Sequence, residues 1–363
     1  MAPFTLRAGD PVVVTGAAGF IGSAVTRALR SRGAVVRAVV EPGAPTGNLE
    51  GLDVERVEAD IVDEVAMAEV LDGARFCFHL AARFGFWPRD VAGFYAANVE
   101  GSRTVVASAV AAKVERVVYT STVATLGLWE TARGIAATES SYAELSHLYG
   151  LYKQTKYVAE HEVLRLAAEG APVVLVLPTM PHGPRDHRPT PSGQVVLDYL
   201  RGKMPGYVDT AMNVAHVDDL AEGHLLALER GAQGRSYICG GENLTMAELL
   251  RTLSQVTGLE AAATRFPSFV PMLAGYVSDT IEGRLLRRSP RVPLEAAQMA
   301  TTTMTFDDTR ARVELGYTSR PAALALYDSA RWFVDHGYVP ADRVAAITWS
   351  SPAPPGAATP SGG

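Results

Sequence analysis

The sequence predicts an α/β protein built on a doubly wound parallel sheet, and three observations lead to this prediction. Short runs of β-branched residues alternate with longer stretches of helical pattern from Pro11 onward. The short runs are continuously apolar, as is typical of strands that are buried on both faces of a parallel sheet. The alternation repeats six times within residues 9–180, which we therefore expect to form one domain.

The elements of this domain are expected in strict alternation. Strands are predicted at residues 11–14, 34–40, 53–58, 75–80, 115–120 and 172–177. The helices between them are predicted at residues 20–32, 65–71, 94–112 and 142–169. Five prolines and two glycines within residues 178–193 then predict a long irregular loop near the carboxyl edge of the sheet.

A smaller, mostly helical region is expected over residues 181–340, with part of it returning to the sheet. Helical patterns occur at residues 195–201, 218–230, 246–256 and 322–333, and one further strand is predicted at 236–240. Residues 350–363 are rich in proline, glycine, serine and alanine, which predicts a disordered tail.

The composition argues against several classes of protein. The chain has 363 residues and a net charge of −6, which disfavours binding to nucleic acid. Its two cysteines, Cys77 and Cys239, lie in apolar runs and are too few for a disulfide framework. Gly16 and Gly19 break the first apolar run well short of the ~20 residues that span a bilayer. We therefore expect a cytoplasmic protein without a transmembrane segment.

A glycine-rich loop lies between the first strand and the first helix. Gly16, Gly19 and Gly22 are spaced by three residues, with Phe20 and Ile21 opening the helix. Such glycines allow a tight turn, a close approach of backbone to a pyrophosphate, and close packing of helix on strand, while the helix N-terminus attracts the phosphates. This context predicts dinucleotide binding by all five residues, and a merely structural glycine turn is the alternative.

The end of the second strand indicates which dinucleotide is bound. Glu41 lies 19 residues after Gly22, where a carboxylate accepts hydrogen bonds from ribose hydroxyls and repels a 2′-phosphate. This favours NAD(H), although Glu41 can also be a plain turn residue and Arg37 keeps NADP(H) open if it faces outward. Asp60 and Ile61, which close the third strand, are expected beside the adenine, with a turn as the alternative role of Asp60.

A tyrosine and a lysine one helical turn apart form a candidate acid–base pair. Tyr152 and Lys156 fall on one face of the expected helix. A neighbouring ammonium lowers the pKa of a tyrosine from its ordinary value of about 10 toward neutrality. Tyr149 and Lys153 have the same spacing, so the helical periodicity leaves both pairs open.

Three hydroxyl residues, Thr120, Ser121 and Thr122, end the fifth strand at the sheet edge where such folds bind ligands. A hydroxyl there can hold a reacting carbonyl oxygen beside the tyrosine. Clusters of this kind also form ordinary turns. The glycine loop and the Tyr/Lys helix in the same chain favour the catalytic role.

Together these segments resemble the extended short-chain dehydrogenase/reductase superfamily, in its NAD-dependent epimerase/dehydratase group. The resemblance covers about residues 10–338. The motifs that carry it, in the family's order, are TGAAGFIG (15–22), HLAA (79–82), NVEG (98–101), YTSTVATLG (119–127) and YKQTKYVAE (152–160). Residues 182–193 and 201–231 look most like the hopanoid-associated sugar epimerase group, whose chemistry resembles that of dihydroflavonol-type reductases.

The resemblance also implies roles for single residues. The family pattern Y-x-x-[ST]-K-x-x-A-E selects Tyr152 and Lys156 over Tyr149 and Lys153, and it implies that Thr122 is the catalytic hydroxyl. Further cofactor contacts implied by the resemblance are Ala81 and Ala82 on the diphosphate side, and Pro178 and Thr179 beside the nicotinamide.

Two departures from the family's patterns bear on cofactor and substrate. Glu41 stands where the related reductases commonly carry arginine, which again points to NAD. Leu177 and Met180 replace the arginine and asparagine that are common in enzymes acting on nucleotide sugars, which argues against such a substrate.

The expected activity is transfer of a hydride between a nicotinamide and a ketone or secondary alcohol, as in secondary-metabolite reductases and dehydrogenases. Tyr152 exchanges the proton, Thr122 orients the oxygen, and Lys156 holds the ribose and lowers the pKa of the tyrosine. Aromatic residues after the fourth strand predict a bulky, largely apolar substrate, or they simply pack the loop. Candidate substrate contacts are Arg83, Phe84, Phe86, Trp87, Met180 and His182.

The main alternative activity is sugar epimerisation with a tightly bound NAD. It uses the same catalytic residues, and a substrate diphosphate would find cations in Arg185, Arg188, Arg201 and Lys203. A non-catalytic dinucleotide sensor would not need the catalytic set. No metal is expected, because His182 and His187 lie in the proline-rich loop and His216 precedes a helix that we expect Asp218 to cap.

Interactions beyond the substrate are left open by the sequence. The amphipathic segment 269–288 has a basic end, so it suits a membrane surface as well as ordinary packing or an oligomer contact. The helices expected at 94–112 and 142–169 resemble those that family members pair in a homodimer.

Overall fold

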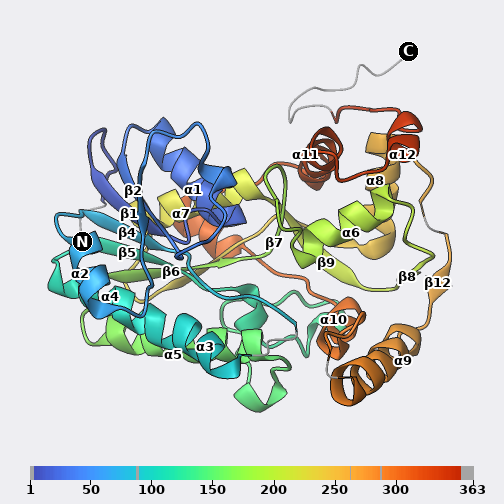
Figure 1. Ribbon diagram of the computed structural model, residues 1–363, viewed down its shortest axis with the longest axis horizontal. Coiled ribbons are helices and arrows are strands. Elements are labelled where there is room, and N and C mark those ends of the chain that lie inside the picture. The colour runs from blue at the N-terminus through green and yellow to red at the C-terminus, as the bar shows by residue number, and fades with distance from the viewer. Residues whose placement is uncertain (1–3, 87–89, 262, 287, 353–363) are drawn as a thin grey trace.

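A seven-stranded parallel sheet forms the centre of the protein in the computed structural model, which describes residues 4–86, 90–261, 263–286 and 288–352. The strand order is β10-β6-β5-β4-β1-β2-β3 (Figure 1). Their bounds are β1 Pro11–Thr15, β2 Val35–Val40, β3 Glu55–Glu58, β4 Phe76–His79, β5 Arg116–Thr120, β6 Val173–Pro178 and β10 Ser236–Cys239. The predicted fold class and its strands are confirmed, and the strand order reverses between β1 and β4, where such sheets bind ligands.

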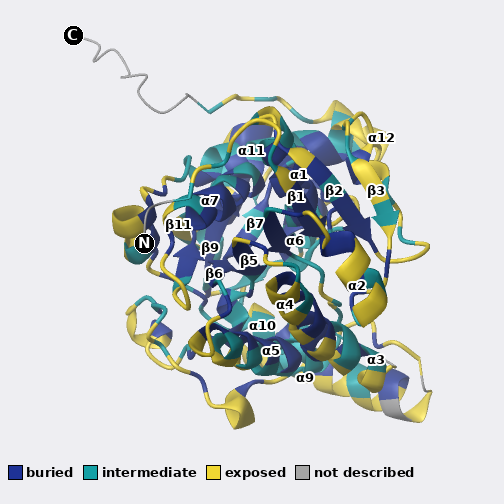
Figure 2. Ribbon diagram, turned by 90° about the vertical axis from the view of Figure 1, so that its left-hand side faces the viewer, coloured by how far each residue is buried: buried dark blue, intermediate teal, exposed yellow. Residues whose placement is uncertain are grey.

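Helices cover both faces of this sheet, because successive strand residues point in opposite directions. Val13 faces one core cluster while Val12 and Val14 face the other. One layer contains α1 (Phe20–Ser31) and α7 (Val217–Arg230). The opposite layer contains α2 (Glu64–Leu71), α4 (Gly101–Ala111) and α5 (Leu151–Ala168). Figure 2 shows the strands buried between the two layers.

The second region adds two small sheets and several helices. One sheet has the order β11-β9-β7, and β12 pairs with β8. The bounds are β7 Met180–His182, β8 Tyr207–Val208, β9 Ala211–His216, β11 Glu242–Thr245 and β12 Arg265–Phe266. The helices are α6 Pro191–Leu200, α8 Met246–Thr257, α9 Phe269–Ser278, α10 Leu294–Ala300, α11 Ala322–Asp335 and α12 Ala341–Ala345. Within the described part of the chain, no helix is long and apolar enough to cross a membrane.

Three sequence expectations about element boundaries were wrong. The helix expected at 142–169 begins only at Leu151, because Gly150 has φ +94° and a left-handed backbone cannot continue a helix. The helix expected from residue 94 begins earlier, as α3 (Val91–Tyr95), since the Asp90 side chain caps Gly93 N at 2.8 Å. The stretch 178–193, expected to be irregular, contains β7 and the start of α6. Of the expected tail, residues 353–363 lie outside the described residues.

Gly150 supplies a test of this boundary. A Cβ at Gly150 would overlap the Glu295 carboxylate, and the position also needs a positive φ. We predict that Gly150→Ala lowers the free energy of unfolding by about 1–3 kcal/mol, as expected for a residue forced into a backbone region that only glycine populates. Chemical denaturation monitored by circular dichroism measures this loss.

The matched control is Gly134→Ala. Gly134 also has a positive φ, of +82°, but nothing lies within 4 Å of the added Cβ. Gly134→Ala should lower the free energy of unfolding by less than Gly150→Ala does, by about 1–2 kcal/mol from backbone strain alone. Equal losses at the two positions would contradict a role for the contact with Glu295.

Candidate active site

The glycine loop is packed so closely that side chains do not fit. Gly16 has φ +68°, and a Cβ there would come within 2.6 Å of the Ala81 backbone nitrogen. A Cβ on Gly22 would overlap the carbonyl oxygen of Gly16. Gly19 is the N-cap of α1 and has no side chain to satisfy the first N–H groups of the helix. The loop therefore has the shape and the free N–H donors of a cradle for a diphosphate.

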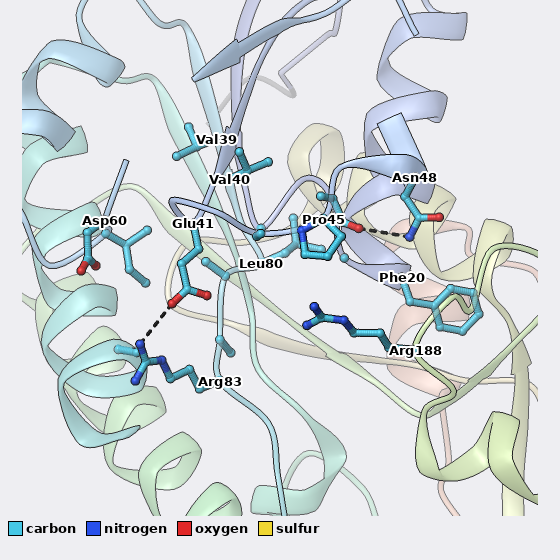
Figure 3. Close-up of a pocket in the computed structure, with 18 of the residues that line it drawn as sticks. Phe20, Val39, Val40, Glu41, Pro45, Asn48, Asp60, Leu80, Arg83 and Arg188 are labelled. Atoms are coloured by element: carbon cyan, nitrogen blue, oxygen red, sulfur yellow. Dashed lines mark hydrogen bonds and ion pairs between the residues drawn. The ribbon is translucent and has the colours of Figure 1, made fainter. Parts of the chain in front are cut away.

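A cavity of about 680 Å³ extends from this loop along the carboxyl ends of β1, β2 and β4 (Figure 3). Nine of the residues singled out from the sequence line it: Gly16, Gly19, Phe20, Glu41, Asp60, Ile61, Ala81, Ala82 and Arg83. The structure does not place the other predicted cofactor contacts, Ile21, Gly22, Tyr152, Lys156, Pro178 and Thr179, on its wall. A glycine cradle, a helix N-terminus and a long cavity together fit a dinucleotide.

Glu41 and Arg83 meet in the cavity at the carboxyl end of β2. Glu41 follows β2 directly, and its carboxylate lies 3.1 Å from the Arg83 guanidinium (Figure 3). Arg83 is thus placed beside the cofactor cavity, whereas the sequence suggested a contact with substrate. Arg37 lies away from the cavity, since it pairs with Glu55 at 3.0 Å. Asp60 lines the cavity and also accepts a turn hydrogen bond from Val62 N at 3.1 Å.

The structure separates the two Tyr/Lys pairs that periodicity left open. Tyr149 precedes α5 and is 62% exposed, while Tyr152 lies in the first turn of that helix. Lys156 follows one turn later and is only 3% exposed. Its ammonium donates to the carbonyl oxygen of Thr120 at 2.8 Å and to the Tyr119 hydroxyl at 3.2 Å. Both acceptors belong to β5, so Lys156 fixes α5 against that strand.

Three neighbouring hydroxyls at the end of β5 have three different partners. The Thr120 hydroxyl lies 3.0 Å from Nε2 of His224. Ser121 turns to the other side and donates to Glu160. The Thr122 hydroxyl accepts from the Ala124 backbone N–H at 3.2 Å and is near enough to the Tyr152 hydroxyl to lower the pKa of that tyrosine. The geometry therefore brings the three residues proposed to be catalytic together, since Lys156 also acts on Tyr152 by its charge.

The pKa of Tyr152 differs from expectation. The positive charge of Lys156 lowers this pKa, as the sequence predicted, and the nearby Thr122 hydroxyl lowers it as well. Burial of the ring is the larger influence and raises the pKa overall, because an enclosed phenolate loses its hydration. Burial likewise lowers the pKa of Lys156, against the opposing effect of Tyr152 and Glu160.

An aromatic wall adjoins Tyr152. The ring centroids of Phe84 and Tyr152 are 4.7 Å apart at an interplanar angle of 73°, and those of Phe84 and Phe86 are 5.3 Å apart. Phe84 is 49% exposed, so this wall presents apolar surface beside the Tyr152 ring. Trp87, expected to belong to the same wall, lies outside the described residues.

The other candidate contacts are packed inside the protein. Met180 and His182 lie in β7 and are buried, with Nδ1 of His182 3.1 Å from the Met180 carbonyl oxygen. Burial lowers the pKa of His182 to about 4, so the ring is neutral near pH 7. Pro178 ends β6, and the buried hydroxyl of the next residue, Thr179, has no hydrogen-bond partner among the described residues.

Sequence reasoning assigned no role to two polar residues that hold the site in place. Asn98 donates to the Thr155 hydroxyl at 2.9 Å and accepts from the Arg83 backbone N–H at 2.7 Å. Glu160 is buried, and its carboxylate accepts from Thr125 at 2.9 Å as well as from Ser121. Both residues stand inside motifs that carried the family resemblance, and this position in the motifs was the available signal.

The basic residues considered for a substrate diphosphate do not converge. Arg185 and Arg188 line the dinucleotide cavity, and Arg185 also pairs with Asp218 at 2.6 Å. Arg201 instead donates to the Tyr338 carbonyl oxygen at 2.9 Å.

The expectation that Asp218 caps α7 was wrong. The N-cap is His216, whose Nδ1 accepts from the Asp218 backbone N–H at 3.0 Å. Among the residues that the structure describes, no cluster of His, Cys, Asp or Glu side chains is arranged to hold a metal.

Comparison with known proteins identifies the class. Residues 12–240 match the model of the NAD dependent epimerase/dehydratase family, and the chain belongs to that family. A Synechocystis sp. protein, whose name places it among the dihydroflavonol 4-reductases, is 39% identical over 91% of this chain and 96% of its own.

Two further proteins are similar along most of their length. The 4-hydroxy-2-methyl-3-oxo-4-farnesyl-3,4-dihydroquinoline-1-oxide ketoreductase of Stigmatella aurantiaca is 29% identical over 85% of this chain and 91% of its own. The crystal structure of gox2253 superimposes with a TM-score of 0.81 at 41% identity, covering 92% of this chain and all of that one.

Glu160 supplies a test of the positioning network. Glu160→Ala removes the acceptor for Ser121 and Thr125, which flank Thr122 on the same loop. We expect kcat to fall at least tenfold with little change in the KM for the cofactor. The loss of stability should be about 1–3 kcal/mol from the unsatisfied buried hydroxyls.

Two further variants serve as controls for this test. Glu160→Gln keeps an acceptor oxygen and should restore most of kcat. Glu162→Ala on the same helix removes a half-buried partner of Arg165 and should leave kcat unchanged. A Glu160→Ala enzyme with the kcat of the parent would show that the network does not position Thr122.

Proposed function

We propose that this chain is an NAD(H)-dependent oxidoreductase acting on a ketone or secondary alcohol of a bulky, largely apolar molecule. One observation carries the proposal. The Thr122 hydroxyl lies beside Tyr152, and the charge of Lys156 acts on this tyrosine. The ring centroid of the exposed Phe84 lies 4.7 Å from that of Tyr152. The groups proposed for proton transfer and an apolar wall thus adjoin the same side chain.

In this proposal each side chain has one task in the reaction. The nicotinamide cofactor, when bound, supplies or accepts the hydride. The Tyr152 hydroxyl gives its proton to the substrate oxygen during reduction and takes it back during oxidation. Thr122 holds that oxygen by a hydrogen bond. Lys156 stabilises the phenolate form, and two of its three N–H donors are bound by β5, which leaves one for the cofactor ribose.

The cofactor preference in this proposal rests on Glu41. Its carboxylate lines the cavity at the end of β2, where a 2′-phosphate would be repelled. Arg83 offsets part of that charge, so the preference for NAD(H) is a matter of degree. Arg37, the basic residue that left NADP(H) open, is engaged with Glu55 away from the cavity.

The substrate class rests on the aromatic wall. Phe84 and Phe86 offer ring faces and edges suited to flat or isoprenoid groups rather than to a sugar hydroxyl pattern. The names of two relatives point the same way, since one concerns dihydroflavonol and the other a farnesylated quinoline ketone.

One observation favours the second candidate function, an epimerase that retains its NAD. Arg185 and Arg188 line the dinucleotide cavity, and such cations would hold the diphosphate of a permanently bound cofactor. NAD that is released only on denaturation, without net turnover of added NADH, would support the epimerase and contradict the reductase.

We also propose a homodimer paired through α4 and α5. A groove of about 670 Å³ lies between these helices, and it is lined by Tyr95, Val99, Arg103, Tyr157 and His161 among others. A location in the cytoplasm stays a prediction from the sequence.

Tyr152→Phe tests the proposed chemistry. Loss of the hydroxyl should reduce NADH oxidation with bulky aryl or isoprenoid ketones by about 10²–10⁴-fold, the usual contribution of a general acid. Tyr149→Phe, which changes an exposed tyrosine outside the helix, should keep the activity of the parent. Equal rates in the parent and Tyr152→Phe would contradict the proposal.

Glu41→Arg tests the cofactor assignment. The substitution replaces the carboxylate by a cation that can pair with a 2′-phosphate, so the ratio of kcat/KM for NADH to that for NADPH should fall at least tenfold, or about 1.4 kcal/mol. Glu58→Arg makes the same charge change outside the cavity wall and should leave the ratio unchanged. An unchanged ratio in Glu41→Arg would remove Glu41 as the selecting residue.

A further inference from the structure

The second region presents a continuous apolar stripe on its outer surface. Helix α9 runs on into a helical turn at Asp279–Leu285, and six exposed apolar side chains recur along one side of both. We define the apolar stripe as Phe269, Leu273, Tyr276, Val277, Ile281 and Leu285. The intervals of three, four and seven residues place these side chains on one helical face, roughly 20–25 Å long.

Exposed apolar side chains are concentrated in and around this stripe. Of the 21 exposed large hydrophobic residues in the described chain, nine fall within residues 269–292. Single exposed apolar side chains are common on any protein, whereas a contiguous patch marks a contact surface.

The opposite side of α9 packs against α10. A Cβ on Gly275 would lie 2.8 Å from Cβ of Ala297 and 3.2 Å from Cα of Leu294, so α9 and α10 touch along that side. The apolar stripe is therefore not a second core face. In Figure 1, α9 lies at the lower right edge of the molecule, away from the seven-stranded sheet.

Positive charge gathers at one end of the stripe. Residues 279–291 contain four arginines and two acidic residues, in a chain whose net charge is −6. Arg291 is 85% exposed, and it shares the carboxylate of Glu282 with Arg288, at 3.4 and 2.6 Å. One carboxylate cannot neutralise both guanidinium groups, so this end stays cationic.

We propose that the apolar stripe docks on an anionic lipid bilayer, with α9 lying in the plane of the interface and the arginines against the headgroups. An amphipathic helix with a basic end binds such surfaces because buried apolar area and attraction to anionic lipid add together. The negative charge that complements the arginines is supplied by phospholipid phosphates.

A second copy of the chain fits this face less well. Two-fold pairing would bring the arginine end of one copy against either the same end or the Phe269 end of the other. The charged group near Phe269 is Arg265, which is itself basic and is already paired with Asp209. The Asp209 carboxylate at that end is thus already engaged by Arg265, whereas an anionic bilayer supplies many phosphates.

The docking surface is also connected by packing to the helix that carries Tyr152. Helix α10, which packs on α9, brings the Glu295 carboxylate onto Gly150, directly before the helix that carries Tyr152. A substrate dissolved in lipid would thus enter beside the aromatic wall. This last step, unlike the docking itself, rests on the proposed function.

Vesicle flotation tests the docking with the full chain. Vesicles of phosphatidylcholine with about a third of phosphatidylglycerol should bind the protein at least tenfold more strongly than pure phosphatidylcholine vesicles, and 0.5 M salt should weaken this binding. The double variant Leu273→Ser/Leu285→Ser should lose at least tenfold in binding, and Arg291→Glu should lose severalfold.

Controls distinguish docking from misfolding and from self-association. Val65→Ser and Val313→Ser remove equally exposed apolar side chains elsewhere and should bind as the parent does. Unchanged thermal unfolding should accompany each variant. No binding by the parent, equal binding by the stripe variant, or a dimer that the stripe substitutions dissociate would overturn the proposal.

A paired activity assay separates this inference from the proposed function. With a water-soluble ketone the stripe variant should turn over NADH as fast as the parent. With a lipophilic ketone embedded in anionic vesicles it should be at least fivefold slower. If Tyr152→Phe keeps full activity, the proposed function fails while the flotation result still decides the docking.

Discussion

The ammonium group of Lys156 is buried against β5, and the positions of the other active-site groups follow from the bonds that this charge requires. A buried cation is tolerated only when its donors find acceptors and an opposite charge lies near. The Thr120 carbonyl oxygen and the Tyr119 hydroxyl meet the first need, and the carboxylate of Glu160 meets the second. These contacts set the position of α5 on the sheet, which brings Tyr152 to Thr122.

Much of this arrangement could be predicted because its causes are local in the sequence. Continuous apolar runs mark strands that are buried on both faces, and the order of the motifs gave the family and the pair Tyr152 and Lys156. The start of α5 was wrong because Gly150 adopts a positive φ that composition does not reveal. The small sheet was missed because β7 is three residues long with Pro181 at its centre, and β11 is mostly exposed.

Other features depend on residues that are far apart in the chain. Arg83 was expected at the substrate, yet it pairs with Glu41, 42 residues earlier. The predicted direction of the pKa shift of Tyr152 was wrong because burial, which raises this pKa, depends on the whole fold. The lysine one turn away, which lowers the pKa, is visible in the sequence. Arg188 was considered for a substrate diphosphate, yet it reaches the dinucleotide cavity from beyond the first domain, which only the folded chain shows.

The second half of the chain completes the first sheet. Strand β10 pairs with β6, and α7 packs against α1, so the parts that close the dinucleotide domain are synthesised after residue 215. A nascent chain that ends near residue 180 holds β6 as an open sheet edge and leaves the apolar side of α1 uncovered. Such an edge is a template for pairing with another chain. Folding on the ribosome therefore has to wait for the C-terminal half, and exposed intermediates of this length are the stage at which chaperones have most to protect.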